Sequence, residues 1–419
     1  MLRYTPLPMR LVSVRDELRE KKPRDIDGIL EIVRRHFTLK DKDFKRFSHY
    51  SGKWYGIITR KRNDYFGTIF SMYGDTPVVI RGYPKIRYAE ESLVLNKECV
   101  VEYKLDGTNL ACYSLPDGTF MCKTRQVERG DRQGYMGRNW MELLRKTESY
   151  SAVERCCRDE NVIIFGELYG YLNQGEFVKY DIPIDYKVFD IVRRDTLTFL
   201  PREEIEDLAS VYGFKTVEVY WRGVLTLEAV EWLERDVLES MHTVDGFVAK
   251  TSIEVGELVI GTVATDRGYH LPVSIPLTDR FFCKLKTEKV KLKCYEISRA
   301  TIPTPLIREA VRKAKENLPI GASQDDLFSM TVEELREEAT QELIKRSKEK
   351  IWRIIYSEMT YSGIEYDIYE YLNELSTQGI DMTDKGTVMR SVAKRFIGVN
   401  PSLAFRVYRK WLKERGMDV

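Results

Sequence analysis

The amino-acid sequence predicts an α+β domain built on antiparallel sheet, followed by an all-helical C-terminal domain. Residues 1–45 are rich in charge and carry apolar residues at helical spacing. Short β-branched and aromatic runs, separated by turn residues, then recur along most of the following sequence. After Ala300 these runs stop and helical patterns replace them. We therefore predict a helical segment over 1–45, a sheet-based domain over 46–299 and a helical domain over 300–419.

The overall composition is that of a globular protein without a global charge signature. The 419 residues are 43% hydrophobic, and 67 basic residues nearly balance 65 acidic ones, giving a net charge of +2. Any surface that binds nucleic acid must therefore be local. No run approaches the roughly 18 apolar residues of a membrane span, and the N-terminus does not resemble a secretory signal. The 7 cysteines include no CxxC pair, so we expect buried free thiols and a cytoplasmic location.

The sheet-based domain is expected to open with an antiparallel meander from Trp54 to about Tyr88. Its runs WYGIIT, YFGTIF and TPVVIRGYP are separated by turns at Lys61–Asp64 and Tyr73–Asp75. Further strand-like runs follow up to about Lys293. Helical patterns intervene near 138–158, 201–212 and 226–240.

Two signals locate helices in the C-terminal domain. Thr331 and Glu334 have the spacing of a capping box, which predicts a long helix that follows them and reaches about Met359. Asn400 followed by Pro401 predicts a helix start. Gly416 is the matching stop.

The most informative string in the sequence is Glu102-Tyr103-Lys104-Leu105-Asp106-Gly107-Thr108-Asn109. A lysine ends an apolar strand, and an Asp-Gly turn reverses the chain at once. Taken alone, this KxDG tetrad is also compatible with an ordinary hairpin turn that exposes a lysine. Four downstream segments change that reading, because each is strand-like and ends in charged groups. They are FGELYG (165–170), YKVFDIV (186–192), DGFVAK (245–250) and FFCKLK (281–286).

These five segments, in this order, resemble the motifs of the covalent nucleotidyltransferase superfamily of ligases and capping enzymes. The resemblance implies an antiparallel-sheet nucleotidyltransferase (ATP-grasp-like ligase) domain. It also implies the use of ATP and of Mg²⁺ or Mn²⁺. In such enzymes a lysine amine attacks the α-phosphorus of ATP, expels pyrophosphate and holds AMP as a phosphoramidate. The amine must be neutral to attack, and we expect nearby cations to lower its pKa.

By resemblance, Lys104 is the nucleophile, and Glu102 receives the adenine amino group. Arg125 contacts the sugar or phosphate of the nucleotide. Glu167 binds the ribose, and Phe189 stacks on adenine.

The remaining implied roles concern metal and phosphate. Asp245 stands where the family usually has a metal-binding glutamate, and it keeps the charge with a shorter reach. Asp106, Asn109 and Glu167 are further expected neighbours of the metal, although Asp106 is equally compatible with a role in shaping the turn alone. Lys250, Lys284 and Lys286 would stabilise the phosphates and supply the positive field. A second KxK pair, Lys291 and Lys293, is a rival for the Lys284–Lys286 assignment.

Within the superfamily, the sequence favours an RNA ligase that joins 5′-phosphate and 3′-hydroxyl ends. Asn109 stands where capping enzymes and most DNA ligases have arginine, and several RNA ligases have asparagine there. The segment VVIRGYPKIRY (78–88) is similar to a strand of the archaeal type of RNA ligase. The resemblance covers about 50–295 and implies a possible homodimer. An ATP-dependent DNA ligase is the alternative, and a nucleic-acid-binding protein that has lost catalysis is a second one.

The predicted helix near the C-terminus has two unlike faces. Ala404, Val407, Tyr408 and Trp411 share one side by their spacing. Basic residues occupy the other side, namely Arg406, Arg409, Lys410 and Lys413. This basic side is compatible both with phosphate binding and with a solvated face of a helix that packs through Trp411.

Overall fold

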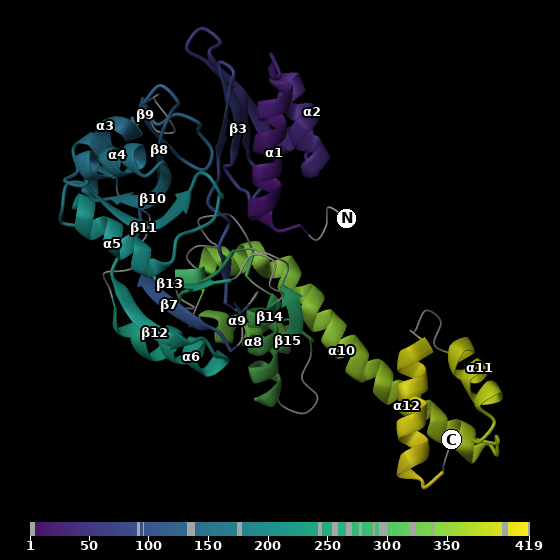
Figure 1. The fold of residues 1–419 in the computed structure, drawn as a ribbon. Coiled ribbons are helices and arrows are strands. Elements are labelled where there is room, and N and C mark those ends of the chain that lie inside the picture. Colours follow the sequence, from purple (N-terminus) through teal and green to yellow (C-terminus); the bar gives the residue numbers. More distant parts are fainter. Residues whose placement is uncertain are drawn as a thin grey trace. The chain divides into compact units, whose positions relative to one another are not determined.

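In a computed structural model, the chain divides into two compact units, Met1–Val290 and Lys291–Val419. Figure 1 shows the helices and strands of both units. The structure describes residues 5–417 with the exception of 90–92, 95, 132–138, 174–177, 242–244, 254–258, 265–269, 276–278, 288–289, 293–300, 303, 318–323, 337–338 and 396–400.

The first unit begins with two helices, α1 (Leu7–Lys21) and α2 (Ile26–His36). The Asp25 side chain caps α2 by accepting a hydrogen bond from the Gly28 amide at 2.8 Å. The apolar face that the sequence predicted for α2 is buried. It packs in one core with the sheet that follows.

That sheet is the predicted meander, and its four strands pair in chain order. They are β1 (Phe44–His49), β2 (Trp54–Thr59), β3 (Ile69–Tyr73) and β4 (Thr76–Ile80). All three pairings are antiparallel, which confirms the meander. The sequence analysis missed β1 because its FKRFSH segment contains too many polar residues to stand out.

A second antiparallel sheet has the strand order β11-β10-β8-β9. Its strands are β8 (Thr108–Ser114), β9 (Phe120–Lys123), β10 (Val162–Tyr169) and β11 (Asp185–Arg193). One face packs in a core with α3 (Trp140–Arg145), α4 (Tyr150–Asp159) and α5 (Arg202–Tyr212). The opposite face belongs to the core of the meander and the N-terminal helices.

A third sheet carries the Lys104 segment and has the order β12-β7-β13-β16-β5. Its strands are β5 (Arg87–Tyr88), β7 (Glu98–Tyr103), β12 (Val219–Val224), β13 (Phe247–Ser252) and β16 (Arg280–Leu285). Its pairings are antiparallel except β16 with β5, which is parallel. One face is apolar and packs with α6 (Leu227–Trp232) and the π-helical and 3₁₀ turns that follow it. A small sheet of β6 (Leu93–Val94), β14 (Val259–Ala264) and β15 (His270–Ile275) completes the unit.

The described part of the second unit contains helices and no strand. They are α8 (Thr304–Glu316), α9 (Gln324–Arg336), α10 (Gln341–Thr377), α11 (Lys385–Arg395) and α12 (Pro401–Glu414). The predicted capping box was wrong. Thr331 lies inside α9 and donates its hydroxyl to the Leu327 carbonyl at 2.7 Å, whereas Thr340 caps the long helix α10. The predicted start at Pro401 is confirmed.

These elements confirm the α+β class with antiparallel sheets and a helical C-terminal region. The six described cysteines are free and buried, as expected. Among the described residues, no helix combines the length and the apolar character that a membrane crossing requires.

Candidate active site

The third sheet gathers five of the predicted site residues on one face. Glu102 of β7, Val248 of β13 and Lys284 of β16 lie opposite one another in register, so their side chains share a face. Two residues along each strand, the same face carries Lys250 and Lys286. Lys104 extends this face, because its amide donates to the Gly246 carbonyl at 2.8 Å and its carbonyl accepts from the Asp245 amide at 3.0 Å.

A single carboxylate joins the predicted nucleophile to the predicted KxK pair. The Lys104 amine donates to Oδ2 of Asp245, and the Lys286 amine donates to Oδ1 of the same group at 2.6 Å. The Lys104 side chain is 28% exposed and that of Asp245 is 1% exposed. The Lys104 side chain is thus partly exposed, while its carboxylate partner is buried.

The electrostatics of Lys104 differ from the expectation. Burial acts to lower its pKa, but the carboxylates of Asp245 and Glu167 outweigh it, and the net effect raises the pKa above its ordinary value. The expected lowering by neighbouring cations is therefore not produced by the side chains of the described residues. Attack by this amine requires the loss of its proton, and additional positive charge beside the amine would make that loss easier.

The second sheet contributes the other predicted nucleotide-binding residues. Glu167 of β10 lies opposite Asn109 of β8 in register. Burial raises the pKa of Glu167 to about 7, although Lys104 and Arg125 act against it. The Arg125 guanidinium lies 5.7 Å from the centre of the Phe66 ring. Burial lowers the pKa of this guanidinium, and the Glu167 charge opposes that shift.

Asp106 shapes the loop that follows Lys104. Its Oδ2 accepts a hydrogen bond from the Val178 amide at 3.0 Å, and its own amide donates to the Tyr180 hydroxyl at 2.8 Å. This supports the structural alternative for Asp106. Its predicted place beside a metal ion stays a prediction.

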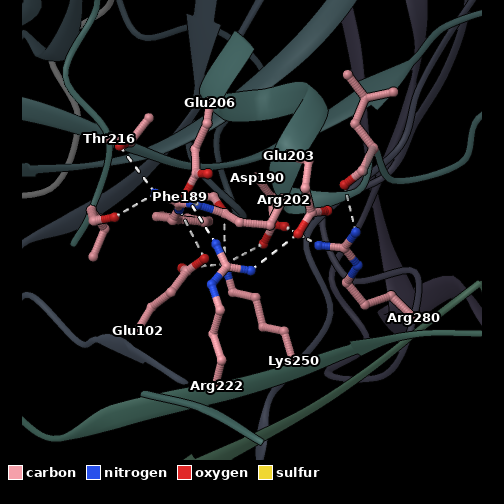
Figure 2. A network of polar contacts seen from close by, with 12 residues as sticks. Glu102, Phe189, Asp190, Arg202, Glu203, Glu206, Thr216, Arg222, Lys250 and Arg280 are labelled. Atoms are coloured by element: carbon pink, nitrogen blue, oxygen red, sulfur yellow. Dashed lines mark hydrogen bonds and ion pairs between the residues drawn. The ribbon is translucent and has the colours of Figure 1, made fainter. Parts of the chain in front are cut away.

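Glu102 and Lys250 lie at the centre of a buried ionic network (Figure 2). The Lys250 amine donates to Oε2 of Glu102 at 2.6 Å and to the Phe189 carbonyl at 2.6 Å. It also lies 3.0 Å from Oδ2 of Asp190. Arg202 donates to Oε1 of Glu102 at 2.9 Å. Both oxygens of Glu102 therefore have protein partners, and its predicted contact with adenine stays a prediction.

Phe189, the predicted adenine-stacking residue, is half-buried at the edge of an aromatic cluster. Tyr83 packs edge-on against it, with ring centres 5.0 Å apart, and donates its hydroxyl to Asp190 at 2.6 Å. The Lys250 amine lies 5.3 Å from the centre of the Phe189 ring. The ring is thus fixed from two sides.

The two rival KxK pairs fall in different places. Lys284 and Lys286 belong to β16 and the residue just after it, and the Lys284 amine lies 3.7 Å from the centre of the Tyr88 ring. Lys291 belongs to the second unit and is buried there. Lys293 lies outside the described residues. The contact of Lys286 with Asp245 favours the first pair.

Several residues that organise the site were missed by sequence reasoning. Arg202, Asp190 and Arg280 complete the network, and Arg280 donates to Oδ1 of Asp190 at 2.9 Å. Arg81 forms two hydrogen bonds of 2.8 Å with the Asp279 carboxylate, and both groups are buried. For Asp190 and Arg81 the one visible signal is a charged residue inside an apolar strand, as in YKVFDIV and TPVVIRGYP.

The oxygen donors near Lys104 are of the kind that Mg²⁺ and Mn²⁺ prefer. Asp245 and Glu167 are the carboxylates whose charges act on Lys104 most strongly. Within the described part of the chain, no three acidic, histidine or cysteine side chains lie close enough together to form a metal cluster. An ion at this place would need waters or substrate phosphates as its remaining ligands.

Comparison with known proteins supports the resemblance to RNA ligases that the sequence motifs indicated. Residues 97–261 match the sequence model of the family described as RNA ligase. This segment contains Lys104, Glu167, Phe189, Asp245 and Lys250. The predicted relationship to RNA ligases of the nucleotidyltransferase superfamily is confirmed for this segment. A comparison with curated proteins found no match.

Solved structures that resemble the chain do so distantly. One is titled archaeal ATP-dependent RNA ligase, form 1, with 18% identity, 79% of this chain and 81% of that chain covered, and a TM-score of 0.46. A putative ATP-dependent DNA ligase from Aquifex aeolicus has 13% identity, 93% and 100% coverage, and a TM-score of 0.43. Naegleria gruberi RNA ligase with PPi has 18% identity, 48% and 52% coverage, and a TM-score of 0.34. Because every score is below 0.5, these superpositions carry no argument.

Proposed function

We propose that this protein is an ATP-dependent RNA ligase that joins 5′-phosphate and 3′-hydroxyl ends. The observation that carries the proposal is the contact of the Lys104 amine with the buried Asp245 carboxylate, within a segment that matches the RNA ligase family. If Lys104 were only an exposed residue of a hairpin turn, we would not expect it to contact a buried carboxylate that also binds Lys286.

The reaction would proceed in three steps, and in each step a nucleophile displaces a leaving group at phosphorus. The Lys104 amine, after losing its proton, attacks the α-phosphorus of ATP, so that a P–N bond forms and the bond to pyrophosphate breaks. That proton passes to solvent water, since the Lys104 side chain is 28% exposed. The 5′-phosphate of the RNA then takes AMP from Lys104, which restores the amine. Finally the 3′-hydroxyl attacks this activated phosphate, and AMP leaves.

The side chains around Lys104 divide these tasks by their chemistry. Phe189 offers a half-buried ring for stacking on adenine, and Lys250 and Tyr83 hold that ring in place. Lys284 and Lys286 supply positive charge for the phosphates. Asp245 and Glu167 would hold a divalent cation, which would supply positive charge beside the Lys104 amine and the phosphates. Glu102 and Arg202 keep Lys250 and its strand in position.

A comparison of ligation substrates tests the choice of RNA. Nicked duplexes of one sequence are prepared with RNA or with DNA at the 3′-hydroxyl side of the nick, because the 2′-hydroxyl lets a site distinguish them. The proposal predicts faster sealing of the RNA-containing nick. Equal or faster sealing of the all-DNA nick would favour the DNA ligase instead. Single-stranded 5′-phosphorylated RNA in the same panel reports whether a nick is required.

Two further expectations belong to this proposal. A homodimer is expected from the resemblance alone, and light scattering that gives the mass of one chain at assay concentrations would remove it. A cytoplasmic location is expected from the free cysteines, and fractionation of the native cell would test it.

A further inference from the structure

The charged residues of the last two helices of the chain are almost all basic. Residues 385–415 contain nine lysines and arginines and one acidic residue, Glu414, in a chain whose overall net charge is +2. All nine basic residues are exposed. They are Lys385, Arg390, Lys394, Arg395, Arg406, Arg409, Lys410, Lys413 and Arg415. We call the outward sides of α11 and α12 the basic face.

Helical geometry separates the basic face from the core that holds these helices. At about 100° per residue, the four basic residues of α12 from Arg406 to Lys413 fall within an arc of about 100°. Tyr408 and Trp411 lie on the opposite side and are fully buried. On α11, Val388 and Val392 are buried while Arg390 and Lys394 are exposed. The predicted packing through Trp411 is therefore confirmed, and it leaves the charged side outward.

The other helices of the same unit show what an ordinary solvated face looks like here. Arg312 of α8 pairs with Glu309 and Glu316, and Arg353 of α10 pairs with Glu349. These are partners three or four residues apart, which support a helix. On α12 the same spacing brings like charges together, as in Arg406 with Lys410 and Arg409 with Lys413. Such like-charge pairs destabilise a helix, and a bound polyanion would relieve their repulsion.

We propose that the basic face of α11 and α12 binds the phosphate backbone of the RNA substrate. The inference rests on the proposed ligase function, because that function identifies the polyanion as RNA. A run of fixed cations along a helix suits a phosphate backbone, whose charges repeat along its length. A symmetric contact with the same face of a second copy is disfavoured, because it would bring like charge to like charge. An anionic membrane fits less well, because Tyr408 and Trp411 are buried in the unit and cannot enter a bilayer.

The test is the salt dependence of RNA binding in a neutralised variant. Arg406, Arg409 and Lys413 are changed together to glutamine in the full chain. Binding of a 5′-phosphorylated single-stranded RNA with a blocked 3′ end is measured by fluorescence anisotropy without ATP. Each lost phosphate contact should flatten the slope of log affinity against log salt by about 0.7. Three contacts predict a slope flatter by about 2 and an affinity lower by about 100-fold at 0.1 M salt.

Two controls make the result specific. Changing Arg312, Arg346 and Arg353 to glutamine removes as many charges from faces where glutamates are present, and it should leave the slope unchanged. Changing Arg406 and Arg409 to lysine keeps the charge and should keep the slope. The neutralised variant should also melt at a higher temperature than the wild type, since like-charge repulsion is relieved.

The outcomes separate this inference from the function on which it rests. An unchanged slope and affinity in the neutralised variant would overturn the RNA-binding assignment. So would unchanged RNA binding together with lost binding to phosphatidylserine vesicles, which would assign the face to a membrane. Self-adenylylation of the same variant with ATP should stay at the wild-type level. Absence of self-adenylylation in the wild-type protein would instead refute the ligase proposal.

Discussion

The buried network beneath the active-site sheet makes a quantitative prediction for the substitution Arg202→Met. The Arg202 side chain is 5% exposed and donates to Glu102 at 2.9 Å and to the Val217 carbonyl at 2.9 Å. Methionine would fill most of the space but leave Glu102 with Lys250 alone. Breaking a buried ion pair by removing one partner costs about 3–5 kcal/mol. Burial already raises the pKa of Glu102, and Lys250 and Arg202 only partly offset this effect. We therefore expect that Lys250 alone does not compensate for the loss of Arg202.

Arg222→Met is the matched control, because Arg222 pairs with two glutamates near the same helix. Its side chain is 45% exposed, and it lies 3.1 Å from Glu203 and 3.3 Å from Glu206. Exposed ion pairs contribute about 0–1 kcal/mol. Both arginines appear in Figure 2, so the two variants compare a buried and an exposed pair within one network.

The assay is urea unfolding followed by tryptophan fluorescence, with the free energy taken from the midpoint at constant slope. Arg202→Met should lower the unfolding free energy by about 3–5 kcal/mol. The double variant Glu102→Gln/Arg202→Met should lose less than the two single variants together, by about 1–3 kcal/mol. A loss of under 1 kcal/mol in Arg202→Met, equal to that of Arg222→Met, would show that Glu102 does not depend on this partner.

Three further predictions concern the Phe189 ring, the KxK motif and one buried amine. Phe189→Ala should raise the ATP concentration needed for self-adenylylation, since stacking on a base contributes about 1–3 kcal/mol, whereas Phe189→Tyr should be mild; unchanged ATP dependence in both would make Phe189 a core residue only. Lys284→Ala and Lys286→Ala should each lower self-adenylylation far more than Lys291→Ala does, and the reverse ranking would assign the motif to the second pair. Burial lowers the pKa of Lys123 to about 7. The unfolded chain therefore binds more protons between about pH 7 and pH 10, and this group alone should make stability rise by about 1.4 kcal/mol per pH unit in that window. Urea unfolding at several pH values should show that Lys123→Met removes this rise. An unchanged pH profile would contradict the lowered pKa of Lys123.

Much of the fold was predictable because its signals are local. Helical spacing of apolar residues located α2, and alternating runs with turn residues between them located the meander. The KxDG tetrad and the four later segments located the face on which Lys104, Lys250 and Lys286 gather. Thr331 was misread because the spacing of a capping box also occurs inside a helix, where the hydroxyl bonds to a carbonyl four residues earlier.

The internal network was not predictable because its partners are far apart in the sequence. Arg202 meets Glu102 across 100 residues, and Lys250 meets Glu102 across 148. No spacing rule connects residues at such distances, and only the pairing of β7 with β13 brings them together. The ion pairs of Glu102 and the raised pKa of Lys104 follow from this tertiary arrangement. The motifs alone had instead predicted a contact of Glu102 with adenine and a lowered pKa of Lys104.

The central claim is that Lys104 carries AMP, and labelling with radioactive ATP tests it most directly. The wild-type protein, Lys104→Ala and the neighbouring surface variant Lys179→Ala are incubated with α-labelled ATP and a divalent cation, and the adenylylated residue is located by peptide mass spectrometry. The account predicts label on Lys104 in the wild type and in Lys179→Ala, and none in Lys104→Ala. Lys104→Ala should still seal RNA that already carries AMP on its 5′-phosphate, because that step forms no bond to the lysine. Label at the wild-type level in Lys104→Ala, or AMP found on another lysine of the unaltered protein, would contradict the account.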